Sequence, residues 1–395
     1  MILHEYHSKA LLKDYHVLVP EGLLIESIEQ TREIMDRLTA DSWVIKAQIH
    51  ALDRKQAGGV KKVHSVTELT QAITAMLGSR LVTPVTGPMG QPVNSILVEK
   101  YIVVSQAYYL RFEVDFEKDR IECVATNCQA HLFSGNGFGE IEEEKNTPLP
   151  RVYADPVAGF QPYHGRRLAF ALGLKAEQIQ HFTDLFLNIY QLFKKQDVFW
   201  LKINPLIFTE DNKFVVADVS MVLDDHASYR HPERSRCRDI RQVDPHVLQA
   251  TKRGFRYIGM RGNIACLVNG TGLAMATADL LRWYGGEPAN ILDIDGKINV
   301  NQVTEAVRFI ASYETTHVLF INIFGGIVSC ADIAKGILAA ISVSDMRVPI
   351  VVRLVGNKAI TAREMIEHEN LKNVTVIEDL ETAAHRVVDM ARGKL

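Results

Sequence analysis

Two oxygen-bearing side chains, Asn204 and Asp218, are the residues of this sequence best suited to hold a metal ion. Asn204 lies within the apolar run 198–207 and Asp218 ends the run 213–218, so the two runs are predicted to be adjacent short strands. An amide and a carboxylate on neighbouring strands suit Mg²⁺, which takes few protein ligands and completes its octahedron with water and phosphate. A hydrogen-bonded polar pair without a metal explains these two residues equally well.

Basic side chains in the first half could bind the anionic part of such a ligand. Lys46 lies inside an apolar strand, where a lysine must find an anionic partner or change its pKa. Arg54 precedes the glycine pair 58–59, and a glycine loop with basic side chains could cover a polyphosphate, although an ordinary hairpin fits the pattern as well. Glu99 lies near the end of the strand 96–100, whose backbone edge could receive a flat adenine ring.

Glycine-containing turns in the second half could bind a second anion. Each of the turns 268–272, 323–328 and 354–357 follows an apolar run and precedes a segment with helical periodicity. Glycine lets the backbone amides at a helix start approach an anion, and the helix dipole favours negative charge there. Three such turns at one sheet edge would suit carboxylate or phosphoryl oxygens.

The second half of the chain is predicted to hold these turns in an α/β fold. From about residue 262 onward, strand and helix patterns alternate five times, which indicates a parallel sheet covered on both faces. Ligands of such sheets bind at the carboxyl ends of the strands. The predicted strands are 263–268, 290–294, 318–324, 349–354 and 374–377, and the predicted helices are 273–283, 301–311, 331–340, 362–369 and 382–391.

The first 240 residues indicate an α+β arrangement with antiparallel strands. Their period-two patterning is clearest at 108–116, where polar and apolar residues alternate. The charged, proline-containing stretch 230–241 is predicted to be a solvated connection between the halves, with a basic anion-binding patch as the less favoured alternative. The predicted helices are 4–14, 28–38 and 176–194, and the predicted strands are 43–48, 96–100, 108–116, 120–126, 198–207 and 213–218.

Composition limits the function classes. The 395 residues are 47% hydrophobic and 23% charged, which is ordinary for a globular protein. With 44 basic and 47 acidic side chains the net charge is -3, which argues against non-specific nucleic-acid binding. No apolar run is long enough for a membrane span, and we expect no secretory leader. Five scattered cysteines fit a reducing compartment, so we expect a cytoplasmic protein.

These motifs, in this order, resemble the β subunits of succinate–CoA ligases. The β subunit of the related malate–CoA ligase shares most of them and is not excluded by them. The matching blocks run almost from end to end of the chain and comprise residues 3–6, 46–50, 91–94, 168–174, 203–206, 268–270, 285–290 and 322–328.

The resemblance implies an ATP-grasp nucleotide-binding domain at 1–243 and a flavodoxin-like CoA-ligase domain at 244–395. In this family the β subunit binds Mg²⁺ with ATP or GTP and phosphorylates a histidine of a separate α subunit, which also holds CoA. The phosphoryl group passes to a small dicarboxylate, and CoA captures the acyl phosphate. The sequence contains no α-like segment, so the resemblance implies a hetero-oligomer with an α subunit.

The resemblance also implies roles for individual residues. Lys46 and Arg54 match contacts to the nucleotide phosphates, and Glu99 matches an acid beside the base. Asn204 and Asp218 match the magnesium ligands. The region that binds the substrate and the second phosphate matches Asn269, Gly325, Gly326, Ile327 and Val328.

The departures from the family lie where chemistry is expected. Lys202 replaces a glutamate that engages the α-subunit histidine, and a lysine cannot accept a proton from an imidazole. Asp53 adds a carboxylate to the phosphate cover, at a cost of about 1 kcal/mol in water and about 4 at an effective dielectric near 20, for a separation of ~4 Å. The other departures are the loss of glycines within 52–56, Ala107 for a glutamate, Ser220 for a lysine, and new sequences at 126–131 and 293–298.

Framework residues therefore agree with the family, whereas several chemical ones differ. Three functions remain open on the sequence. The chain is the β subunit of an active acid–CoA ligase, in which Lys202 could supply phosphate-binding charge lost elsewhere. Alternatively, it is a catalytically impaired regulatory or structural paralog, or an ATP-grasp ligase that forms an acyl phosphate for another nucleophile.

Overall fold

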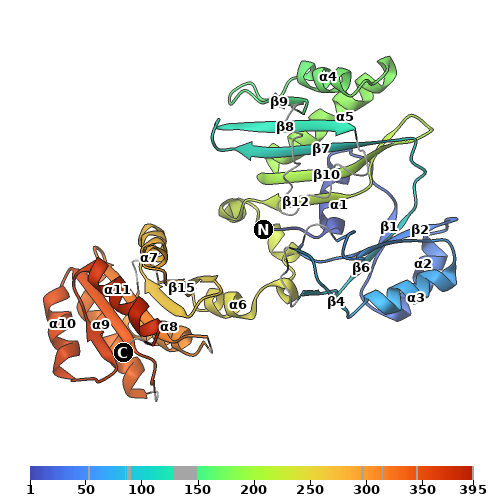
Figure 1. The fold of residues 1–395 in the computed structure, drawn as a ribbon. Helices are drawn as coiled ribbons and strands as arrows, with labels where there is room; N and C mark the ends of the chain where they lie inside the picture. The colour runs from blue at the N-terminus through green and yellow to red at the C-terminus, as the bar shows by residue number, and fades with distance from the viewer. Residues whose placement is uncertain are drawn as a thin grey trace. The chain divides into compact units, whose positions relative to one another are not determined.

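The computed structural model describes residues 1–51, 54–84, 86, 90–127, 149–294, 298–313, 315–343 and 346–393. It divides into two compact units, Met1–Gln242 and Val243–Leu395. Figure 1 shows unit 1 in blue to yellow-green and unit 2 in yellow to red. Each unit has its own sheets and its own hydrophobic core.

The first part of unit 1 is a four-stranded antiparallel sheet in the order β1-β6-β2-β3. Helix α3 begins at a serine cap, because the Ser65 hydroxyl accepts a hydrogen bond from the Glu68 amide. The apolar side of α3 packs on the sheet through Leu69 and Ile73, which contact Ile45 within one core cluster. The elements are α1 (Glu5–Asp14), β1 (Gly22–Ile25), η1 (Ile28–Gln30), α2 (Thr31–Arg37), β2 (Trp43–Ala47), β3 (Val60–Val63), α3 (Val66–Met76), β4 (Arg80–Leu81), β5 (Gln91–Pro92) and β6 (Ile96–Lys100).

The second part of unit 1 is a six-stranded sheet with the path β11-β10-β7-β8-β9, and β12 also pairs with β10. Two helices, α4 and α5, lie along one face of this sheet, as Figure 1 shows. The elements are β7 (Gln106–Asp115), β8 (Arg120–Asn127), β9 (Arg151–Tyr153), α4 (Pro162–Ala171), α5 (Ala176–Lys195), β10 (Val198–Phe208), β11 (Phe214–Val216) and β12 (Val219–Leu223).

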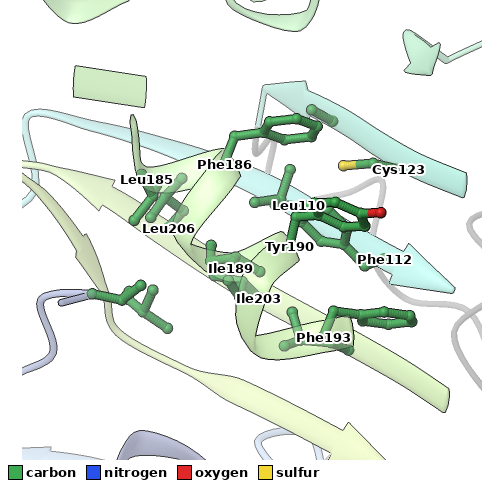
Figure 2. Packing of buried hydrophobic residues seen from close by; sticks show 14 of the residues in the cluster. Leu110, Phe112, Cys123, Leu185, Phe186, Ile189, Tyr190, Phe193, Ile203 and Leu206 are labelled. Atoms are coloured by element: carbon green, nitrogen blue, oxygen red, sulfur yellow. The ribbon is translucent and has the colours of Figure 1, made fainter. Parts of the chain in front are cut away.

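The alternation of apolar and polar side chains along β7 and β10 determines which face of the sheet the helices cover. In Figure 2, Leu110 and Phe112 of β7 point toward α5 together with Ile203 of β10. Phe186 of α5 lies among them, with its ring centroid 5.4 Å from that of Phe112 and 5.0 Å from that of Phe160. The intervening residues of both strands point to the opposite face, which is where the polar side chains gather.

Unit 2 is a six-stranded sheet in the order β13-β15-β14-β16-β17-β18. The five strands from β14 to β18 are parallel and lie in the spatial order 2-1-3-4-5, which is the flavodoxin-like order. Helices α7 and α11 pack on one face, and α8, α9 and α10 pack on the other. The elements are α6 (Pro245–Lys252), β13 (Arg256–Gly259), β14 (Ile264–Val268), α7 (Thr271–Trp283), β15 (Pro288–Asp293), α8 (Val300–Ala311), β16 (Val318–Gly325), α9 (Cys330–Val343), β17 (Ile350–Gly356), α10 (Ala359–His368), β18 (Val374–Val376) and α11 (Leu380–Ala391).

The predicted fold class is confirmed: an α+β half with antiparallel sheets is followed by a parallel α/β half. Among the described residues, none of the helices combines the length and apolar character that crossing a bilayer requires. The sequence reading missed short or mostly exposed elements such as β13, whose only buried residue is Tyr257.

The stretch 230–241 lies directly before the division between the two units, and most of its residues are exposed, as predicted for a solvated connection. It forms short 3-10 turns, among them η3 (Pro232–Cys237), that belong to unit 1. The Asp197 carboxylate binds both the Arg230 guanidinium and the His231 imidazole, and Arg234 is buried. Contacts with residues distant in the sequence therefore fix part of this connection.

Truncating Phe186 to alanine should destabilise unit 1 by about 3–5 kcal/mol, because the fully buried ring would leave a cavity between α5 and the sheet. The matched control is Phe170→Ala on α4, whose side chain is largely exposed. Urea denaturation followed by tryptophan fluorescence measures both. Equal effects of the two substitutions would contradict the packing described here.

Candidate functional site

A cleft of about 730 Å³ in unit 1 is lined by residues from both of its sheets. One wall comes from β2, β3 and β6, and the other comes from β10, β12 and the start of β7. Every site residue that the sequence predicted in this half lines this cleft. They are Lys46, Arg54, Glu99, Lys202, Asn204 and Asp218.

Asn204 and Asp218 face each other across a shared interruption of two paired strands. The register of β10 shifts between Ile203 and Leu206, and the break between β11 and β12 falls opposite. Two backbone hydrogen bonds hold the break together: the Asn204 amide donates to the Asp218 carbonyl at 3.1 Å, and the Ala217 amide donates to the Pro205 carbonyl at 3.1 Å. The Asn204–Pro205 peptide bond is cis.

Two buried lysines and two buried glutamates form the floor of the cleft. The Lys46 ammonium lies 2.7 Å from Glu5 Oε1 and 2.8 Å from Glu99 Oε2. The Lys9 ammonium lies 2.7 Å from Glu5 Oε1 and 2.5 Å from Glu99 Oε1. Both ammonium groups also donate to the Ala217 carbonyl. All four residues are less than 5% exposed, so their charges are compensated by one another rather than by water.

Arg54 extends this floor to Asp218. Its guanidinium lies 2.9 Å from Glu5 Oε2 and 3.2 Å from Asp218 Oδ1, and it donates to the Ala47 carbonyl. Three basic side chains thus balance three acidic ones. We call this set the floor network; it comprises Glu5, Lys9, Lys46, Arg54, Glu99 and Asp218.

The pKa values of the floor network follow from burial and from these contacts. Burial alone would raise the pKa of the Glu5 carboxyl, but Lys46, Lys9 and Arg54 hold it well below its usual value. Burial, reinforced by Glu5, raises the pKa of the Asp218 carboxyl. Burial lowers the pKa of the Lys9 ammonium, whereas Glu5 and Glu99 raise that of Lys46 despite its burial. Glu5 is therefore the anion on which the cluster of cations depends.

Part of the lining of the cleft is apolar, including Pro20, Val44, Ile102 and Ile207. Such side chains suit a flat heterocycle. The Glu99 carboxylate is bound to the two buried lysines.

Lys202 and Ser220 lie beside the Asn204 and Asp218 pair and are direct cross-strand partners. Both line the cleft, as does Ala107. Their positions, two residues from Asn204 on β10 and two from Asp218 along the partner strand, give one face of the sheet four polar residues in a block.

In unit 2 the three predicted glycine turns follow β14, β16 and β17, which are neighbouring parallel strands and so end at one edge. The Asn269 side chain makes two hydrogen bonds with the backbone of Phe324. Its amide nitrogen donates to the Phe324 carbonyl at 2.8 Å, and its oxygen accepts from the Phe324 amide at 2.9 Å. Asn269 therefore holds the end of β16 in place.

The residues of the turn after β16 differ in how deeply they are buried. A Cβ on Gly325 would lie 2.6 Å from Cys330 Sγ, so the backbone approach to α9 requires glycine. Gly326 and Ile327 are exposed, whereas the Val328 side chain is part of the core. At Val328, therefore, the backbone rather than the side chain is the part that can face a ligand.

Glu5 and Lys9 are the functional-site residues that the sequence reasoning missed. Their signal was present: the two charges stand four residues apart on the stripe of α1 that also carries the buried Leu12. Charged residues on the apolar side of an amphipathic helix indicate a buried ion pair. The predicted changes at Asp53, 128–131 and 295–297 lie outside the described residues.

The donors of the cleft fit a magnesium ion that shares its coordination with phosphate. Asn204 and Asp218 supply one amide and one carboxylate oxygen donor from facing strands, and Mg²⁺ commonly takes one or two protein ligands. Within the described ranges, no group of three or more histidine, cysteine, aspartate or glutamate side chains could hold a metal by itself. Arg54 competes for the same Asp218 carboxylate.

Comparisons with known proteins agree with this two-part architecture. Residues 2–208 match the family described as ATP-grasp domain, and residues 267–388 match the family described as CoA-ligase. Among curated proteins, the chain is 41% identical over 398 aligned positions to the β subunit of the ADP-forming succinate–CoA ligase of a Nitratiruptor species, covering 100% of both. It is 40% identical to the corresponding subunit of Histophilus somni, covering 99% of both.

A solved structure shares the fold at low sequence identity. ATP citrate lyase from Methanothrix soehngenii, in complex with citrate and coenzyme A, matches 99% of this chain and 99% of that chain with a TM-score of 0.76 and 16% identity. At this identity the likeness concerns the fold alone.

Glu5→Gln should destabilise unit 1 by about 3–5 kcal/mol, because it leaves three buried cations without their shared anion. The control Glu33→Gln, which breaks an exposed helical pair with Arg37, should cost less than about 1 kcal/mol. Chemical denaturation compares the two. A small effect of Glu5→Gln would mean that water reaches the network.

Stability should also fall in acid because of Glu5. Its pKa in the folded chain lies below the usual 4.5, so the unfolded chain takes up the proton first as the pH falls. The stabilisation from Glu5 is complete above about pH 4.5 and is lost progressively below it. Thermal unfolding between pH 6 and pH 3 should therefore show a weaker pH dependence for Glu5→Gln than for the wild type.

Proposed function

Because this chain belongs to the family of succinate–CoA ligase β subunits, we propose that it is the β subunit of a nucleotide-dependent acid–CoA ligase. Unit 1 binds the magnesium nucleotide, ATP or GTP, and unit 2 handles the carboxylate and the phosphoryl group. The catalytic complex includes an α subunit that supplies the phosphorylated histidine and CoA. The four described cysteines are unpaired, which supports a reducing, cytoplasmic location.

The observation that carries this proposal is the placement of Asn204 and Asp218 in one cleft with Lys46, Arg54 and several apolar side chains. The base would lie against apolar lining residues such as Pro20 and Ile102. Asn204 and Asp218 would hold magnesium, which would neutralise part of the phosphate charge. The phosphates approach Lys46 and Arg54 from the open side of the floor network.

Nucleotide binding then requires an exchange of partners. The Arg54 Nη2 group contacts both Glu5 and Asp218, and it would have to give up Asp218 if that carboxylate held a metal; it could then donate to a phosphate oxygen while keeping Glu5. In unit 2, Asn269 fixes the strand end that presents the amide of Ile327 to anionic substrate oxygens.

A second candidate function is that of an impaired regulatory or structural paralog. The charges of the floor network favour this function, because Lys46 and Arg54 are already paired with carboxylates of the same chain. Such a protein would keep the subunit-docking surfaces and bind nucleotide weakly.

The test is thioester formation by the chain co-expressed with a succinate–CoA ligase α subunit. We expect nucleotide- and CoA-dependent acyl-CoA with succinate or another small dicarboxylate. A complex that assembles but forms no thioester, and binds no Mg-nucleotide by calorimetry, would establish the paralog instead. Hydroxamate formation from a carboxylate without any α subunit would indicate a direct acyl-phosphate ligase.

Asp218→Asn should weaken Mg-ATP binding at least tenfold, because it removes the anionic ligand of the metal, and should reduce the dependence of binding on magnesium. The control Asp211→Asn removes the same charge from an exposed turn of unit 1 and should bind as the wild type does. Calorimetry with and without EDTA measures both. Unchanged magnesium dependence in Asp218→Asn would exclude Asp218 as a ligand.

A further inference from the structure

Two lysines of the floor network are bound to the same three oxygens, which we call the shared acceptors. Glu5 Oε1 lies 2.7 Å from the Lys9 ammonium and 2.7 Å from the Lys46 ammonium. Glu99 Oε2 lies 2.7 Å from Lys9 and 2.8 Å from Lys46. The Ala217 carbonyl accepts from Lys9 at 2.7 Å and from Lys46 at 2.5 Å. Each shared acceptor therefore keeps one ammonium donor when the other lysine leaves.

The two lysines differ in their access to a ligand. Lys46 lies on β2 and lines the cleft, together with Glu99 and Ala217. Lys9 lies on α1 and is not among the described residues that line the cleft. An anion in the cleft can therefore contact Lys46 directly, whereas Lys9 stays bound to the shared acceptors.

The presence of a second cation decides whether Lys46 can leave the shared acceptors. Removing the partner of a buried charge is strongly destabilising, because the remaining charge is compensated neither by water nor by an ion. When Lys46 withdraws, Glu5 keeps its contacts with Lys9 and Arg54. Glu99 keeps Lys9, whose ammonium lies 2.5 Å from Glu99 Oε1. Neither buried carboxylate is left without a cation.

The shared carbonyl also connects Lys9 to the metal-ligand pair. This carbonyl belongs to the peptide bond that joins Ala217 to Asp218. The Asp218 carbonyl accepts from the Asn204 amide, so the peptide bond lies at the strand break where these two residues face each other. The hydrogen bond from Lys9 therefore holds this backbone even when Lys46 has left it.

We propose that Lys9 is a positioning residue, which holds the shared acceptors in place while Lys46 exchanges them for a phosphate of the nucleotide. This inference rests on the proposed nucleotide function of unit 1. Lys9 does not contact the nucleotide in this scheme. It acts through the two carboxylates and through the backbone that carries Asp218.

The first test compares Mg-ATP binding by calorimetry for the wild type, Lys9→Met and Lys9→Arg. In Lys9→Met the shared acceptors have only Lys46, so a phosphate must draw it away from buried carboxylates, and the affinity should fall about tenfold or more. Lys9→Arg keeps a cation with several donors and should stay within about threefold of the wild type. The matched control Lys13→Met removes an exposed lysine from the last turn of the same helix and should bind as the wild type does.

A charge-balanced pair of variants separates this role from an effect on folding. Lys9→Met/Glu99→Gln removes one buried charge of each sign from the floor network, and Glu99→Gln alone is its reference. In the double variant the Ala217 carbonyl still depends on Lys46, so the affinity for Mg-ATP should be about fivefold or more below that of the reference. Thermal unfolding of the same samples should show that the double variant is at least as stable as Lys9→Met. A purely structural role would leave the affinities of the double variant and its reference equal.

The outcomes separate this inference from the proposed function. A wild type that does not bind Mg-ATP removes the nucleotide function of unit 1, and this inference with it. A wild type that binds, with Lys9→Met binding equally well, overturns the role of Lys9 alone. If Lys9→Met does not fold, the charge-balanced pair decides, and equal affinities of its two members would likewise overturn the role of Lys9.

Discussion

The buried carboxylate of Glu5 is the interaction on which the candidate site of unit 1 depends. It stands between Lys9, Lys46 and Arg54 and joins helix α1 to the first sheet and to the loop after β2. Isolated ions in such surroundings would cost several kcal/mol each, so the cations can be buried only together with their partners. The floor network beneath the cleft is therefore neutral overall rather than positively charged.

Under the proposed function, a neutral floor changes what a nucleotide must do to bind. Where lysines have no partner the phosphates add the missing anion, whereas at this floor they would replace a carboxylate that already contacts Lys46 or Arg54. The pair Asn204 and Asp218 would then contribute more to the affinity. Several of the departures from the family, Lys202 and Ser220 among them, line this same cleft.

Much of the fold was predictable because it rests on local periodicity. The five apolar runs of the second half became β14 to β18 within a few residues, since strands buried on both faces carry an unbroken hydrophobic signal. Short or exposed elements such as β13 carry little of that signal. The exposure of most of the stretch 230–241 followed from its charge, whereas the pairing of Arg230 and His231 with Asp197, a residue distant in sequence, did not.

By itself, the sequence determined the order of domains, the family, and the residue types proposed to bind magnesium and phosphate, because these depend on motifs and on their spacing along the chain. Tertiary structure alone decided which of those charges are compensated within the fold. It paired Lys46 and Arg54 with Glu5, and it joined the Asn269 side chain to the backbone of Phe324. The physical reason is that compensation of charge in low dielectric depends on distances of a few ångströms between segments far apart in sequence.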